Sequence, residues 1–358
     1  MKKILVLPAG MPAAVNFARL NRDRFELLGA SSNYFEPAAT EYSHCFYLPH
    51  VSETTFVARL ECILAENNIK SIFCAHQVVW SLIANEIASR LGVELVNAAP
   101  IPAMLKPYQF AMTEADRLRQ HAQLFDKNLN LPPQIALAAL YRQFVEIPGE
   151  CDRDKLLLFL IAFATAPAGD VVEIGSLWGK SAYVLAWLSQ FHGIGSVLCI
   201  DPWSQQELIQ SSPDNQLVRL STATHDINQG FLVFCQNLLA AGFRNVNYRR
   251  QLSSEASHYY AANRRVSSPE FGSTDYTGAV SIAHIDGNHD IAAVRQDVDD
   301  WGPRVLPGGW LIIDDYTWKF GDGPRKVGDE YLLGQLSNWD CAFVMGGALA
   351  LKKGERND

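Results

Sequence analysis

The chain has 358 residues, with 30 basic and 38 acidic side chains and a formal net charge of -8. This length predicts two domains, and the acidic balance argues against a nucleic-acid surface, which requires a basic stripe. With 48% hydrophobic and 19% charged residues, the composition excludes a mainly disordered chain. The apolar runs are shorter than the roughly 20 residues of a membrane span, so we expect no membrane partner either.

The cysteines and the N-terminus bear on the cellular compartment. Seven cysteines are scattered without a C-x-x-C pair, so neither a disulfide framework nor a structural zinc site is predicted. The apolar stretch that follows Lys2 and Lys3 stops at Pro8, which is too short for a secretory signal. We therefore expect a cytoplasmic protein.

The first hundred residues alternate between strand-like and helix-like patterns. The predicted strands are 4–7, 25–31, 46–48, 72–74 and 94–96, and the predicted helices are 54–66 and 79–91. Such alternation favours parallel βαβ units. We predict a small Rossmann-like α/β domain over residues 1–103.

A helical connector follows this domain. Pro100 and Pro102 interrupt the alternation, and residues 104–165 then have a helical pattern. Pro133 is expected to begin one helix and Pro148 to end it. We interpret this segment as a connector or a cap over the next domain.

A stronger α/β alternation fills residues 166–358. Strands are predicted at 171–174, 196–200, 246–249, 280–285 and 310–313, with helices between them and a terminal hairpin around Gly346 and Gly347. Five βα units that end in a hairpin predict a second, larger Rossmann-like domain. The long connections 204–228 and 266–277 are expected to carry substrate contacts.

Two motifs at predicted strand ends indicate a small-molecule site. The turn after the first strand reads Glu173-x-Gly175-x-x-x-Gly179, which differs from the G-x-G-x-x-G of dinucleotide enzymes. Asp201 ends the second strand, where a carboxylate can accept hydrogen bonds from both hydroxyls of a ribose. A glycine-rich turn without a ligand and an Asp-Pro turn are the alternatives.

The third motif gathers acidic residues at two consecutive strand ends. Asp286 and His289 follow one strand, and Asp314 and Asp315 follow the next. Neighbouring strands lie about 4.8 Å apart, so these carboxylates would repel one another unless a cation is present. Oxygen ligands favour Mg²⁺. Asp314 and Asp315 can share an ion only if the strand ends there, and the alternative is that these aspartates cap helices.

Together these motifs resemble the class I S-adenosylmethionine-dependent methyltransferases. The segments 286–289 and 314–316 resemble the branch of Mg²⁺-dependent sugar, macrolide and cephalosporin-tailoring O-methyltransferases. The resemblance covers about half of the chain and implies a seven-stranded methyltransferase sheet with a terminal hairpin. This family often has Glu-Asp where this sequence has Asp314-Asp315.

The resemblance also implies roles for individual residues. His289 would be the general base, and Asp286 would also take part in catalysis. The metal ligands for Mg²⁺ would be Asp286, Asp314 and Asp315. The residues that bind S-adenosylmethionine would be Glu173, Gly175, Ser176, Gly179, Ser181, Asp201, Ser253 and Asp286.

The predicted function is a Mg²⁺-assisted O-methyltransferase that acts on a hydroxylated small molecule, such as a sugar or a natural-product scaffold. One alternative is a binding or assembly protein that keeps the cofactor fold without chemistry. Another, an NAD-dependent oxidoreductase, is disfavoured by the glycine spacing. The N-terminal domain more distantly resembles the Rossmann-like domain that precedes ATP-grasp folds, and a homo-oligomer is left open.

Overall fold

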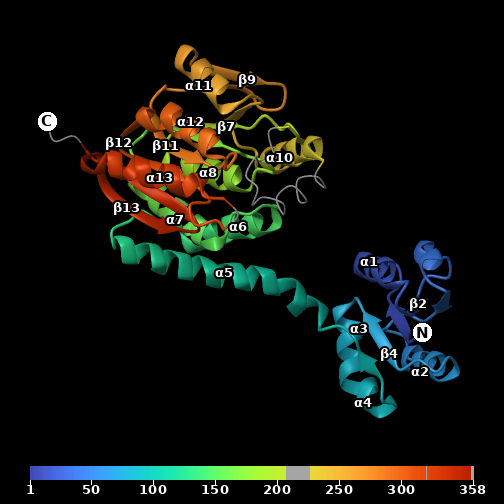
Figure 1. Ribbon diagram of the computed structural model, residues 1–358. Helices are drawn as coiled ribbons and strands as arrows, with labels where there is room; N and C mark the ends of the chain where they lie inside the picture. The colour runs from blue at the N-terminus through green and yellow to red at the C-terminus, as the bar shows by residue number, and fades with distance from the viewer. Residues whose placement is uncertain (207–225, 320, 356–358) are drawn as a thin grey trace. The chain divides into compact units, whose positions relative to one another are not determined.

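The computed structural model describes residues 1–206, 226–319 and 321–355. Its internal contacts divide the chain into two units, Met1–Gln109 and Phe110–Asp358, with the division inside helix α5 (Pro100–Phe125). Each unit has its own sheet and its own core (Figure 1). Most of the predicted connection 204–228 lies outside the described residues.

The N-terminal unit is built on a five-stranded parallel sheet with the order β3-β2-β1-β4-β5. Its strands are short and buried at the centre of the sheet, as parallel strands covered on both faces should be. They are β1 (Lys3–Leu7), β2 (Glu26–Ser31), β3 (His44–Tyr47), β4 (Ser71–Cys74) and β5 (Glu94–Leu95).

Helices cover both faces of this sheet. One face packs against α1 (Pro12–Asn21) through Ala14 and Ala18. The opposite face packs against α2 (Phe56–Glu66), α3 (Gln77–Leu82), the π-helical turn η2 (Ile83–Ile87) and α4 (Ala88–Leu91). The expected Rossmann-like arrangement is therefore present in this unit.

The C-terminal unit contains a seven-stranded sheet with the order β13-β14-β12-β11-β6-β7-β8. All its neighbours are parallel except β14, which runs antiparallel to both β12 and β13. The strands are β6 (Asp170–Ile174), β7 (Val197–Ile200), β8 (Val246–Arg249), β11 (Val280–Ile285), β12 (Val305–Ile313), β13 (Trp339–Met345) and β14 (Ala348–Lys353). This sheet and its terminal hairpin confirm the predicted fold class.

Two layers of helices enclose the sheet, because successive buried residues of each strand face opposite sides. Val171 and Val172, for example, belong to different core clusters. One layer contains α6 (Gln134–Glu146), α7 (Arg153–Thr165), α8 (Lys180–His192) and α10 (Ile227–Ala241). The other contains α11 (Ser253–Ala262), α12 (Ile291–Trp301) and α13 (Gly323–Gly334).

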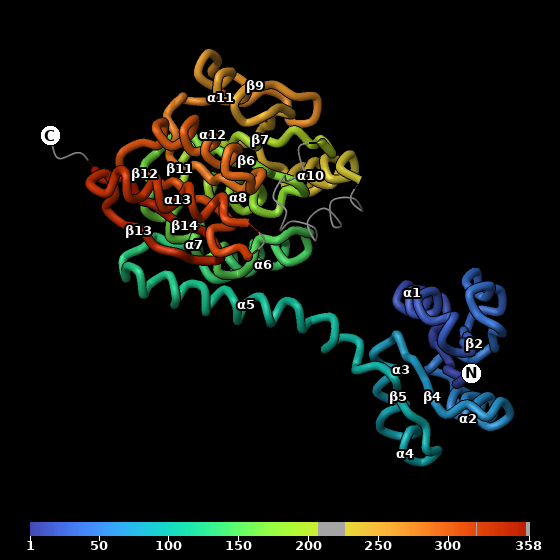
Figure 2. The backbone as a smooth tube through the Cα atoms, in the orientation of Figure 1, coloured from blue at the N-terminus to red at the C-terminus, as the bar shows by residue number. Residues whose placement is uncertain are grey.

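Helix α7 of the predicted connector packs against the C-terminal sheet. Nine consecutive residues of α7, from Lys155 to Phe163, are buried, since the helix lies beside α8 and against β12 and β13 (Figure 2). An amphipathic surface helix would expose one side, whereas α7 is enclosed all round. The helix thus carries Lys155 into the interior.

One sequence expectation was wrong, and one helix begins earlier than expected. Pro100 and Pro102, which were expected to end the α/β alternation, lie in the first turn of α5, where proline is tolerated. The expected long connection 266–277 is instead an antiparallel pair, β9 (Arg265–Ser268) and β10 (Gly272–Asp275). In the described part of the chain, no helix is both long enough and apolar enough to cross a bilayer.

Candidate functional site

The turn from β6 into α8 is held against the ends of the neighbouring strands. The Gly175 N–H donates to the Ile200 carbonyl at 2.8 Å, and the Asp286 N–H donates to the Ile174 carbonyl at 2.8 Å. Gly175 has φ +83°, and a Cβ atom there would lie 1.8 Å from the Asp286 carbonyl oxygen. Only glycine fits at this crossing.

Asp201 faces this turn from the end of β7. One carboxylate oxygen accepts the Leu177 N–H at 2.9 Å, and the other accepts the Trp203 N–H at 2.7 Å. Burial raises the pKa of Asp201, and these backbone donors partly oppose the rise. Asp201 therefore fixes the glycine-rich turn in addition to any ligand that it binds.

A cavity of about 430 Å³ lies over these strand ends. It brings together most of the predicted site residues, which follow β6, β7, β8, β11 and β12 in the chain. Those that line it are Gly175, Ser176, Ser181, Asp201, Ser253, Asp286, His289 and Asp315. Glu173, Gly179 and Asp314 are not among the described residues of its lining.

Gly179 and Glu173 support the cavity from behind. Gly179 adopts φ +85° at the N-terminus of α8, and its N–H donates to the Ser176 carbonyl at 2.7 Å. Glu173 is fully buried and accepts a hydrogen bond from the Ser176 hydroxyl at 2.6 Å. Both residues shape the loop that carries Ser176.

The connector also contributes to the cavity. The segment 148–151, between α6 and α7, forms part of the lining. Among the aromatic residues near the strand ends, Trp178 lines the cavity, whereas Trp203 is buried in the core.

The acidic residues at the ends of β11 and β12 form two overlapping groups. One group is His284, Asp286 and Asp314, and the other is Asp286, His289 and Asp315, with ligand atoms within 4.8 Å of one another in each. Strand β12 ends at Ile313, and Asp315 adopts φ +54°, so Asp314 and Asp315 diverge. The predicted set of Asp286, Asp314 and Asp315 is thus divided between the two groups.

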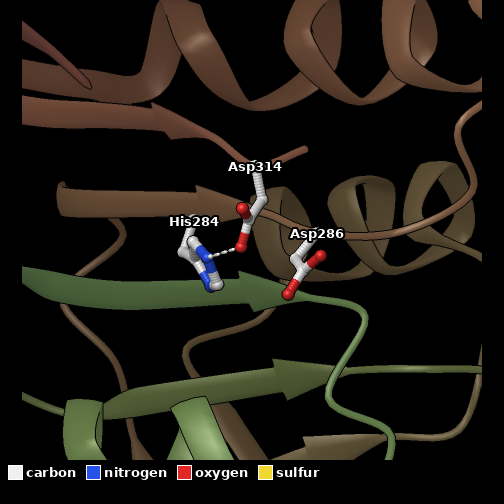
Figure 3. A group of neighbouring side chains, drawn as sticks. All are labelled: His284, Asp286 and Asp314. Carbon is white, nitrogen blue, oxygen red and sulfur yellow. Dashed lines mark hydrogen bonds and ion pairs between the residues drawn. The ribbon is translucent and has the colours of Figure 1, made fainter. Parts of the chain in front are cut away.

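His284 lies in the inner group (Figure 3). Its Nε2 is 3.2 Å from Asp314 Oδ2, and its Nδ1 is 3.5 Å from Glu173 Oε1. Burial by itself lowers the pKa of His284, but the interactions with the Asp314 and Glu173 carboxylates outweigh it and raise the pKa to about 9. His284 therefore lies between the Asp314 and Glu173 carboxylates, which favour its protonated form.

Lys155 completes the inner group, and sequence reasoning missed it. Its ammonium forms an ion pair with Asp314 Oδ2, and the lysine is only 5% exposed. Burial opposes ionisation of Asp314, yet His284 and Lys155 hold the pKa of Asp314 well below its usual range. A charged residue at the start of a long apolar run was the signal, because a buried ammonium needs a partner.

The outer group faces the cavity. His289 Nε2 lies 2.8 Å from Asp315 Oδ2, and the imidazole contacts the Trp318 ring edge-on at a centroid distance of 4.5 Å. Asp286 has a raised pKa, first because of burial and then because of the charge of Asp314. Two carboxylates beside an imidazole fit one divalent cation. Asp314 belongs to the inner group, where it is paired with Lys155.

A further carboxylate, Asp297 of α12, lines the cavity and was not predicted. It is 6% exposed, and it accepts a hydrogen bond from Ser253, whose hydroxyl in turn accepts the Trp301 indole N–H at 2.9 Å. Burial raises the pKa of Asp297 to about 6. Asp297 lies on the apolar face of α12, three residues after Val294 and four before Trp301, and this spacing was the signal that could have found it.

Asp297 provides a pH-dependent test of the site. A raised carboxyl pKa means that the native state favours the protonated form, so this group destabilises the fold increasingly as pH rises from about 4 to 6. We expect Asp297→Asn to raise the free energy of unfolding on the order of 2 kcal/mol at pH 7.5 and by much less at pH 4. Urea unfolding at both pH values measures this, with the exposed Asp299→Asn as control; equal effects at both pH values would contradict it.

Comparison with known proteins agrees with this architecture. Residues 172–316 match a family of methyltransferase domains. No curated protein sequence matches the chain. Among solved structures, the O-methyltransferase NovP is 14% identical, with a TM-score of 0.40, and the match covers 63% of this chain and 82% of NovP.

Two further solved structures are similar at comparable levels. The calicheamicin methyltransferase CalS11 is 13% identical, with a TM-score of 0.36 over 69% of this chain and 93% of CalS11. The methyltransferase PaMTH1 of Podospora anserina, bound to SAH, is 12% identical, with a TM-score of 0.39 over 67% of this chain and 95% of PaMTH1. The C-terminal unit of this chain thus contains a segment, residues 172–316, that matches a methyltransferase domain family and lies within the seven-stranded sheet and its helices.

Proposed function

We propose that the chain is an S-adenosylmethionine-dependent O-methyltransferase that acts on a hydroxyl of a small molecule. The observation that carries this proposal is the single cavity that joins the Gly175 turn, Asp201 and the Asp286–His289 segment. Ligands of open α/β sheets bind beyond the carboxyl ends of the strands, where this cavity lies. Its volume of about 430 Å³ suits small-molecule ligands.

The chain's own residues would bind the cofactor in three parts. The turn at Gly175 and Ser176 would receive the methionine end, because its backbone approaches the cavity closely. The carboxylate of Asp201 keeps lone pairs beyond its two backbone bonds and would accept the ribose hydroxyls. Ser253, with Asp297 behind it, would lie on the adenine side.

His289 would be the general base. Because Asp315 accepts a hydrogen bond from Nε2, the neutral imidazole would present Nδ1 as its proton-accepting nitrogen. When bound, S-adenosylmethionine supplies a methyl group on a sulfonium, which the acceptor oxygen takes as its proton passes to His289. The cavity would position the acceptor oxygen next to the methyl group.

The carboxylates of Asp286 and Asp315 would hold a divalent cation beside His289. Such an ion lowers the pKa of a coordinated hydroxyl and fixes its orientation. Turnover that persists in EDTA would reject this part of the proposal and leave the methyltransferase intact. Cofactor binding without transfer to any hydroxylated compound would favour the alternative, a binding or assembly protein.

Calorimetry with S-adenosylhomocysteine tests the cofactor site. We expect Asp201→Ala to weaken binding about 10- to 100-fold, because it removes a charged acceptor and releases the turn at Leu177. Asp299→Ala, an exposed change on α12, is the matched control and should leave the affinity unchanged. Equal affinities for the wild type and Asp201→Ala would contradict the assignment of this cavity.

A further inference from the structure

Lys155 is fixed in place from both ends. The Gly346 turn between β13 and β14 lies directly on its backbone, since a Cβ at Gly346 would be 2.3 Å from the Lys155 nitrogen. At the other end, its ammonium is paired with Asp314 Oδ2. The backbone of Lys155 is thus fixed by the terminal hairpin, and its buried side chain reaches the acidic residues.

The carboxylate of Asp314 has partners on both oxygens. Oδ2 is shared by Lys155 and by His284 Nε2 at 3.2 Å, and Oδ1 accepts the Asp315 N–H at 2.7 Å. Asp314 is 3% exposed and is not among the described residues that line the cavity. A cation that enters from the cavity therefore meets Asp286 and Asp315 first.

We propose that the ammonium of Lys155 takes the place of a metal ion beside Asp314. Lys155 thereby keeps Asp314 from acting as a metal ligand. A divalent cation then has only Asp286 and Asp315 as carboxylate ligands among the described residues of this cluster. The inference rests on the cation site of the proposed function but concerns a different residue. The positive charge of Lys155 also explains why three neighbouring aspartates can lie close together in the fold without a bound metal ion.

The location of bound Mn²⁺ in crystals of the full chain tests this directly. In the wild type, we expect the anomalous signal beside Asp286 and Asp315, with Lys155 still paired to Asp314. In Lys155→Met, we expect Asp314 to join the ligands and the affinity for Mn²⁺, measured by calorimetry, to rise at least tenfold. Lys155→Arg, which keeps the charge, should retain the wild-type affinity.

The double variant Lys155→Met/Asp314→Asn removes both charges, and its affinity for Mn²⁺ should return to within about threefold of the wild-type value. This result would show that the gain in Lys155→Met comes from Asp314 as an added ligand and not from the space that the lysine leaves. Mn²⁺ bound to Asp314 in the wild type, with Lys155 displaced, would overturn the inference. So would unchanged Mn²⁺ affinity in Lys155→Met. If Lys155→Met does not fold, the wild-type ion position decides. Failure of the wild type to bind S-adenosylhomocysteine would instead contradict the cofactor assignment alone.

Discussion

Replacement of Gly175 by alanine is expected to cost about 4 kcal/mol or more of unfolding free energy and to abolish binding of S-adenosylhomocysteine. The added Cβ would lie 1.8 Å from the Asp286 carbonyl oxygen, and the residue would keep a φ of +83°. The atoms that the Cβ would meet belong to the backbone of Asp286 and Gly287, which cannot rotate away as a side chain can. The turn and the loop after β11 must therefore move apart. Urea unfolding and calorimetry measure the two effects.

Gly242→Ala is the matched control. Gly242 has φ +68° after α10, with nothing within 4 Å of an added Cβ, so only the conformational cost of roughly 1–2 kcal/mol applies. Cofactor affinity should not change in this variant. If Gly175→Ala lowered the free energy of unfolding by no more than Gly242→Ala does, the close contact between the Gly175 turn and the loop after β11 would not be needed for stability.

The second large effect is expected at His289. We expect His289→Ala to lower kcat about 100- to 10,000-fold, because the acceptor hydroxyl loses its general base. The affinity for S-adenosylhomocysteine should stay within about twofold, since the imidazole acts on the acceptor rather than on the cofactor. Steady-state kinetics with a hydroxylated acceptor that the wild type methylates, combined with calorimetry, measures both quantities.

His258, an exposed histidine on α11, provides the control for this variant. His258→Ala should leave kcat and the cofactor affinity unchanged. A His289→Ala enzyme with a wild-type kcat would remove His289 from the chemistry. A loss confined to cofactor affinity would place it in the binding site instead.

Much of the site could be anticipated because its signals are local. A glycine that must adopt positive φ, such as Gly175, is visible as a glycine at a strand-to-helix turn. Aspartates after buried runs, such as Asp201 and Asp286, mark strand ends, and in a parallel sheet those ends share one edge. The five βα units and the hairpin could be predicted from alternating strand and helix periodicities, because these patterns are also local in sequence.

Other features depended on contacts that are distant in sequence. Lys155 and Asp314 are 159 residues apart, and their pairing arises only when α7 packs against β12. The division of the aspartates into two groups depends on where β12 ends and on the positive φ of Asp315. Asp297 is buried only because α12 packs over the sheet beside Ser253.

By itself, the sequence determined the two α/β units, the glycine-rich turn and the acidic strand ends, because periodicity and turn chemistry act over a few residues. The tertiary structure decided that Asp201 binds the turn, that His284 and Lys155 neutralise Asp314, and that Asp286, His289 and Asp315 face the cavity. The physical reason is that the free energy of a buried charge depends on which distant partners packing brings within hydrogen-bonding distance.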